Sequence, residues 1–144
     1  MTILLTFIGS QDPYSLGLVG EEEQPGPILA MAGARRYDRI LLLATRDQGP
    51  KSGETRGAVL ERCPGVEVDI FELPLDNLND GAAILRALRS GLLPSLESCR
   101  DADLCVSLSS GTPQTHTAWF LLLLAIIARS WVVAGVGAVR PRLR

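Results

Sequence analysis

The chain has 144 residues, of which 47% are hydrophobic and 21% are charged, and its formal net charge is −2. This length and composition fit a single globular domain over residues 1–144 and exclude a disordered chain. The acidic balance argues against binding of long nucleic acid, because such binding needs a broad basic face.

The cysteines and the first residues indicate a cytoplasmic protein. Cys63, Cys99 and Cys105 are too scattered for a disulfide scaffold or a zinc ribbon, so we expect reduced core cysteines. The apolar start Thr2–Ile8 has neither a basic segment before it nor a small-residue cleavage site after it, which argues against a signal peptide.

Apolar runs and turn residues predict strands that alternate with helices. The expected elements, in chain order, are a strand at Thr2–Ile8, a loop at Gln11–Gln24, a helix starting at Pro25–Pro27, a strand at Arg39–Ala44, a loop at Thr45–Glu54, a helix at Thr55–Arg62, an edge strand at Val66–Leu73, a turn at Leu78–Gly81, a helix at Ala82–Leu93 ended by Pro94, a strand at Asp103–Leu108, a loop at Ser109–Pro113, a helix at Gln114–Ala128 and a strand at Trp131–Val139. This order predicts a Rossmann-like three-layer α/β sandwich with a mostly parallel sheet.

The last two elements raise the question of a membrane span. Ala118–Ala128 is entirely apolar, and a second apolar run follows it. Arg129 and Ser130 separate the two runs, and the second is rich in valine and glycine. A buried helix followed by a strand therefore fits better than one span of about 20 residues, and we expect no membrane contact.

Ligands of a parallel sheet bind beyond the carboxyl ends of the strands, where the strand order reverses. Three loops rich in small or polar residues are expected there. They are Gly9–Tyr14, Thr45–Lys51 and Ser109–Gln114. Together they form the candidate site.

The pattern Ser109–Pro113 fits an anion site. Gly111 lets a ligand approach the backbone, and the following helix presents free N–H groups and the positive end of its dipole. The same residues also fit an ordinary helix start, with Thr112 as N-cap and Pro113 in the first turn. The spacing alone leaves both interpretations open.

Other candidates carry weaker patterns. His116, the only histidine, fits either a structural hydrogen bond or a ligand contact with proton transfer. Arg46 and Lys51 are candidates to face phosphates, with solvated loop charges as the alternative. Glycine-rich nucleotide motifs, a nucleophile elbow and a metal-ligand cluster are absent from the sequence, so we expect neither a metal nor a cofactor.

The run Ser109-Ser-Gly-Thr-Pro-Gln114, followed by His116 and Trp119, resembles the CARF (CRISPR-associated Rossmann fold) domains, in the subgroup with a Ser-Gly-Thr-Pro-Gln-Met-His motif. Thr115 stands where that motif has methionine. Further segments agree, namely Leu4–Gly9, Asp12-Pro13-Tyr14, Tyr37-Asp38-Arg39, Glu72-Leu73-Pro74-Leu75 and Val139-Arg140-Pro141.

This resemblance implies a homodimer that binds a cyclic oligoadenylate, with cyclic tetra-adenylate expected, as a type III CRISPR-associated sensor domain. The pocket of such domains crosses the two-fold axis and is lined by the loops after the first and fourth strands. The implied ligand-binding residues are Gly9, Ser10, Gln11, Asp12, Ser109, Ser110, Gly111, Thr112, Pro113 and Gln114, with Thr45 and Arg46 added by position.

Several alternatives remain at this stage. One is a metal-independent ring nuclease, in which a ribose 2′-hydroxyl attacks the adjacent phosphate and Ser10, Arg46, Lys51 and His116 are the candidate catalytic residues. Others are the sensory domain of an RNA-repair-type transcription regulator and a regulatory domain for another small ligand. CARF domains generally precede an effector, so the resemblance leaves open a standalone sensor, a ligand sponge, a ring nuclease and the sensory fragment of a longer protein, with an effector outside this sequence as one candidate partner.

Overall fold

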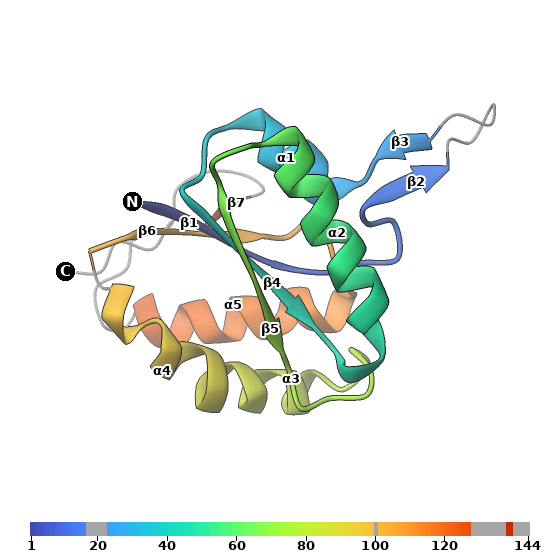
Figure 1. Cartoon of the computed structure of the whole chain (residues 1–144). Helices are drawn as coiled ribbons and strands as arrows, with labels where there is room; N and C mark the ends of the chain where they lie inside the picture. The colour runs from blue at the N-terminus through green and yellow to red at the C-terminus, as the bar shows by residue number, and fades with distance from the viewer. Residues whose placement is uncertain (17–22, 100, 128–137, 140–144) are drawn as a thin grey trace.

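The computed structural model describes residues 1–16, 23–99, 101–127 and 138–139 (Figure 1). Its strands are β1 (Thr2–Phe7), β2 (Tyr14–Leu16), β3 (Glu23–Pro25), β4 (Arg39–Ala44), β5 (Glu67–Glu72), β6 (Asp103–Ser107) and β7 (Ala138–Val139). Its helices are α1 (Pro27–Ala34), α2 (Gly49–Arg62), α3 (Gly81–Ala87), α4 (Leu93–Ser95) and α5 (Pro113–Ile127), with short helical turns at Arg46–Gln48 (η1), Leu88–Leu92 (η2) and Glu97–Cys99 (η3).

The main sheet has the order β5-β4-β1-β6-β7. The pairs β4–β5, β1–β4 and β1–β6 are parallel, and β7 pairs antiparallel with β6. Helices α1 and α2 cover one face, whereas α3 and α5 cover the other (Figure 1). The Rossmann-like fold with a mostly parallel sheet is thus confirmed, and its strand order reverses between β1 and β6.

Strand β1 lies at the centre of both hydrophobic layers. Leu5 and Phe7 pack toward α3 and α5, whereas Leu4 and Ile8 pack toward α1 and α2. Trp119 of α5 meets Phe7 edge to face, with ring centroids 5.5 Å apart. Because burial of each large apolar side chain contributes about 1.5–3 kcal/mol, these contacts fix the end of β1 where the site begins.

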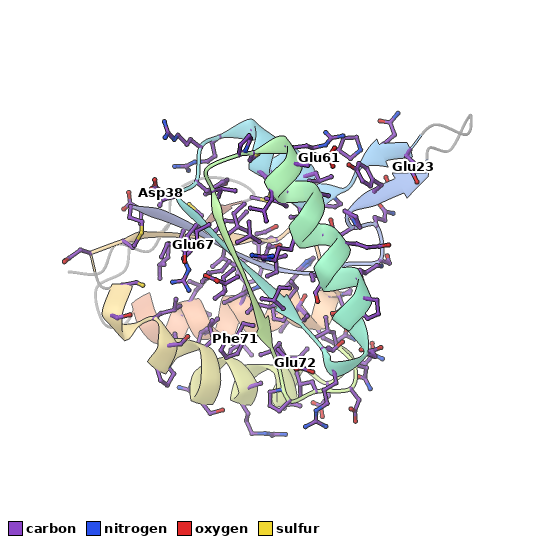
Figure 2. The ribbon with its side chains drawn as sticks, viewed as in Figure 1. Glu23, Asp38, Glu61, Glu67, Phe71 and Glu72 are labelled. Carbon is purple, nitrogen blue, oxygen red and sulfur yellow. The ribbon has the colours of Figure 1, made fainter. Side chains whose placement is uncertain are left out.

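The predicted edge position of β5 is confirmed. Glu67 and Glu72 are exposed at its two ends, and Phe71 is half-buried (Figure 2). Asp69 accepts a 2.7 Å hydrogen bond from Arg39 of β4, which raises the pKa of Arg39. Charged side chains on an edge strand discourage pairing with another sheet.

The predicted loop Thr45–Glu54 is wrong over most of its length. After the short turn η1, helix α2 begins at Gly49 rather than at Thr55, so Lys51 lies on a helix. Pro50 suits a first helical turn. Ser52 and Thr55 donate their hydroxyls to carbonyls of the same helix, at 2.7 and 2.8 Å, so these residues do not interrupt it.

Three other expectations also need correction. The loop Gln11–Gln24 contains the two-stranded antiparallel sheet β2–β3. Pro94 does not end the third helix: the chain passes through the π-helical turn η2 and stays helical to Ser95. A π turn relieves the clash that a proline ring otherwise makes with an earlier carbonyl. Most of the expected strand Trp131–Val139 lies outside the described residues.

All three cysteines are free, as expected. Among the described residues, no helix has the length and apolar character that a membrane crossing requires.

Gly26 is required by the close approach of the chain before α1. A Cβ atom at this position would collide with the carbonyl oxygen of Gln11. We expect Gly26→Ala to lower the free energy of unfolding by about 1–3 kcal/mol through overpacking. Gly33→Ala is the matched control, because it adds a Cβ into open space on α1 and is expected to stabilise by up to about 1 kcal/mol. Urea denaturation measures the stability of both variants, and equal unfolding midpoints would contradict the requirement for glycine at position 26.

Candidate ligand site

The loops that follow β1 and β6 meet at the point where the strand order reverses. They enclose a cavity of 220 Å³, lined by Gly9, Ser10, Gln11, Asp12, Pro27, Ser109, Ser110 and Gly111. Two of the three predicted loops therefore come together as expected, although about 100 residues separate them in the sequence. The reason is topological, because β1 and β6 are parallel neighbours in the sheet.

Asp12 joins these two loops. Its carboxylate accepts hydrogen bonds from Gly9 N (2.8 Å) and Ile28 N (3.0 Å), and from the hydroxyl of Ser110 (2.9 Å). The residue is only 2% exposed. Hydrogen bonds to an ionised group are stronger than neutral ones, so Asp12 organises the site, and its oxygens are occupied by protein donors.

Two glycines allow the close contact between the loops. Gly111 has a φ of +103°, a conformation that favours glycine, and a Cβ there would collide with Thr115. A Cβ on Gly9 would lie 3.1 Å from the backbone nitrogen of Gly111. The backbone is therefore exposed to the cavity at both positions.

Thr112 caps helix α5. Its hydroxyl accepts from Thr115 N at 3.3 Å, and Thr115 Oγ1 accepts from Thr112 N at 3.0 Å, which is a reciprocal capping arrangement. The Thr112 hydroxyl also donates to the carbonyl of Leu78 at 2.6 Å. The helix-start interpretation of this motif is thus confirmed, and Thr115, which replaces the motif's methionine, takes part in it.

A second cavity, of 490 Å³, adjoins the first one and shares Gly9, Ser10 and Gly111 with it. Its other lining residues are Ile8, Thr45, Asp47, Gln48, Lys51, Asn77, Leu78 and Thr112. Thr45, Asp47, Gln48 and Lys51 belong to the predicted loop Thr45–Lys51, whereas Asn77 and Leu78 lie outside the predicted site loops. The loop after β5 supplies the last two, and the rule that parallel strands end at one edge of the sheet would have found it.

Lys51 is the only lysine of the chain. Its ammonium group donates to the carbonyls of Gly9 and Ser10, both at 3.1 Å, so α2 supports the loop after β1. A third cavity, of 490 Å³, is lined by Lys51 together with acidic residues that include Glu23 of β3 and Glu61 of α2 (Figure 2). Among the residues that line these three cavities, Lys51 is the single cation.

Arg46 has a different environment. Its guanidinium group lies 3.5 Å from Asp76, its side chain is 57% exposed, and it lines none of the three cavities. Gln48, which the sequence did not single out, takes the structural position nearby. It donates to the carbonyl of Ile8 at 3.1 Å and accepts from Thr45 N at 3.0 Å, so it links the end of β1 to the loop after β4.

His116 lies behind the Ser109–Gly111 loop. Its Nε2 atom is 3.2 Å from the carbonyl oxygen of Ser110. Because a carbonyl can only accept, this nitrogen carries the proton in the observed arrangement. His116 therefore supports the loop as a donor. Of the remaining predicted residues, Pro113 and Gln114 form the first turn of α5.

The described residues contain no group of three or more histidine, cysteine or acidic residues placed to hold a metal ion. The polar groups that line the first two cavities include hydroxyls, backbone groups and one ammonium, together with the carboxylates of Asp12 and Asp47 and three side-chain amides. This set is suited to hydrogen bonding of phosphate and ribose oxygens.

The fold has relatives among solved structures. One is Csm6 from Enterococcus italicus bound to cyclic hexa-2′-fluoro-hexa-dAMP, which is similar over 87% of this chain and 30% of its own, with a TM-score of 0.71 and 22% identity. Another is protein VC1899 from Vibrio cholerae, over 85% of this chain and 28% of its own, with a TM-score of 0.60 and 16% identity. The chain thus spans less than a third of either protein. No protein-family model and no curated protein matches the sequence.

Asp12→Ala tests how the two loops are joined. The substitution leaves two backbone N–H groups and the Ser110 hydroxyl without their acceptor. We therefore expect the free energy of unfolding to fall by about 3 kcal/mol. Ser109→Ala is the matched control on the same loop, because its exposed side chain is expected to contribute less than about 0.5 kcal/mol. Thermal unfolding compares the two variants, and similar melting temperatures would refute a joining role for Asp12.

Proposed function

We propose that the chain is a CARF-type domain that binds a cyclic oligoadenylate, most simply cyclic tetra-adenylate, as a type III CRISPR-associated sensor. The observation that carries the proposal is the meeting of the β1 and β6 loops around a cavity lined by backbone groups and hydroxyls. The similarity of fold to Csm6, whose structure holds a cyclic oligonucleotide analogue, supports the same ligand class.

The site residues divide into two groups under this proposal. Ser10 and Ser109 are exposed, and their hydroxyls have no hydrogen bond among the described residues, so they are free to contact phosphate or ribose oxygens. Asp12, Ser110 and Thr112 use their side chains within the protein, so they position the loops. Lys51 retains a third N–H for a phosphate and supplies the positive charge beside it.

The homodimer is part of the same proposal. Helix α5 exposes Phe120 (52%), Leu121 (49%) and Leu124 (62%) on one side. The spacing of three and four residues places them in one stripe, which continues through the exposed Thr117 to Pro113 at the site. Because an exposed apolar patch marks an interaction surface, pairing of two copies along α5 would bring two Ser109–Gln114 loops together.

A ring nuclease is the second candidate. It is favoured by Ser10 and Lys51 lining the same cavity as the exposed loop backbone, which would hold a phosphate during attack by the adjacent ribose 2′-oxygen. That attack forms a 2′,3′-cyclic phosphate and releases the 5′-oxygen of the next nucleotide. His116, as a donor on the loop, would then support the loop geometry.

Titration calorimetry with cyclic tri-, tetra- and hexa-adenylate tests the ligand. We expect heat with at least one ring, and Lys51→Met should weaken its binding about tenfold or more, which corresponds to about 1.4 kcal/mol. Arg46→Met is the matched control, since this cation faces Asp76, and we expect less than a twofold change.

The absence of heat with all three rings would overturn the proposal. Mass spectrometry of the recovered ligand separates the two candidate functions, because a sensor returns the intact ring and a ring nuclease returns linear fragments.

Leu121→Glu tests the dimer surface. A charge in the α5 stripe should shift the protein from dimer to monomer in sedimentation velocity, because a desolvated carboxylate in an interface is costly. Ile70→Glu is the control, because it places the same charge on another exposed apolar side chain, on the edge strand β5 (41% exposed). A monomeric wild-type protein, or equal behaviour of both variants, would exclude this surface.

A further inference from the structure

Strand β5 leaves one side of the main sheet open. It pairs with β4, and no other described strand pairs with it. The amides of Glu67 and Leu73 donate to carbonyls in or next to β4, at 3.1 and 2.8 Å, so every second residue of β5 faces β4. The residues between them, which are Val68, Ile70 and Glu72, therefore direct their N–H and C=O groups outward. An edge of this kind is a template for a further strand.

The composition of β5 favours pairing with the same strand of another copy. Val68, Ile70 and Phe71 are residue types that are enriched in strands, and Ile70 is 41% exposed. The carboxylate of Asp69 already pairs with Arg39 of β4, 2.7 Å away. The two exposed glutamates of β5 lie at its ends, so they leave the middle of the edge unprotected.

Arg56 of α2 occupies the open side of the strand. Its Nε–H group donates to the outward carbonyl of Val68 at 2.9 Å. An added strand would place its own N–H at this distance from the same carbonyl. Arg56 is exposed, and in the described part of the chain no carboxylate forms an ion pair with it. A strand that covered Arg56 would therefore remove an uncompensated charge from water, which is costly.

Helix α2 holds Arg56 in this position. The helix lies beside β5 (Figure 1), and its Ala58 and Val59 belong to one hydrophobic cluster with Val68. Arg56 comes from the same part of the helix. The packing of α2 on the sheet thus places the guanidinium group at the edge of β5.

We propose that Arg56 closes the β5 edge and prevents the sheets of two copies from joining through β5. The inference does not depend on the ligand, and it concerns a different surface from the α5 stripe. Antiparallel pairing of two β5 strands is a self-complementary contact. Where two copies already pair along α5, a second contact of this kind would join the dimers into open chains, so the edge has to be closed.

Arg56→Met tests this role. The variant removes the donor and the charge and keeps an unbranched side chain. We expect species larger than those of the wild type to appear at about tenfold lower protein concentration, because the edge loses a hydrogen bond from a charged group. Arg86→Met is the matched control, since it removes the same charge from an exposed position on α3. Sedimentation velocity over a concentration series compares the variants.

A second substitution tests where the new contact lies. Ile70→Lys in the Arg56→Met protein returns a positive charge to the middle of the edge, and we expect it to restore the sedimentation of the wild type. All variants are measured well below their melting temperatures, so that unfolded chains do not contribute. Equal sedimentation of Arg56→Met and the wild type overturns the proposal. Association that persists with Ile70→Lys also overturns it, because the contact then lies elsewhere.

Discussion

The carboxylate of Asp12 lies between two loops that are 98 residues apart in the chain. It binds the backbone of the loop after β1, the first turn of α1 and the hydroxyl of the loop after β6. Without this group the two strand ends would still be neighbours, because the sheet places them side by side. The loops, however, would lack the contact that gives the cavity its shape.

Around that contact the site is built mainly from backbone. Gly9 and Gly111 bring the loops to a separation that side chains would prevent, and the hydroxyl of Thr112 is used to start α5. Lys51 then supports the β1 loop from the opposite helix. The proposed anion site is compatible with a net charge of −2, because one ammonium and several N–H groups act at short range.

The sequence predicted the order and type of the main strands and helices well, and the residues at which helices begin and end less well. Strand β4 was predicted with the bounds that the structure has, because Ile40–Ala44 is a continuous apolar run directly after Arg39. The predicted start of α2, Thr55, lies six residues after the observed start, Gly49, because Gly49, Pro50 and Gly53 are residue types that are typical of loops. Once Pro50 occupies the first turn and Ser52 and Thr55 bond to the helix's own carbonyls, the same residues are compatible with a helix.

By itself, the sequence determined the alternation of strands and helices and the three loops of small or polar residues, Gly9–Tyr14, Thr45–Lys51 and Ser109–Gln114, that form the candidate site. Those features depend on local apolar runs and on small residues next to them, which are visible without coordinates. Only the tertiary structure decided what each side chain of the site does. Asp12 and Thr112 are held within the protein, Arg46 is turned toward Asp76, and Asp47 and Asn77 are brought to one cavity. These roles follow from contacts between segments far apart in the chain, and such contacts leave no periodic signal in the sequence.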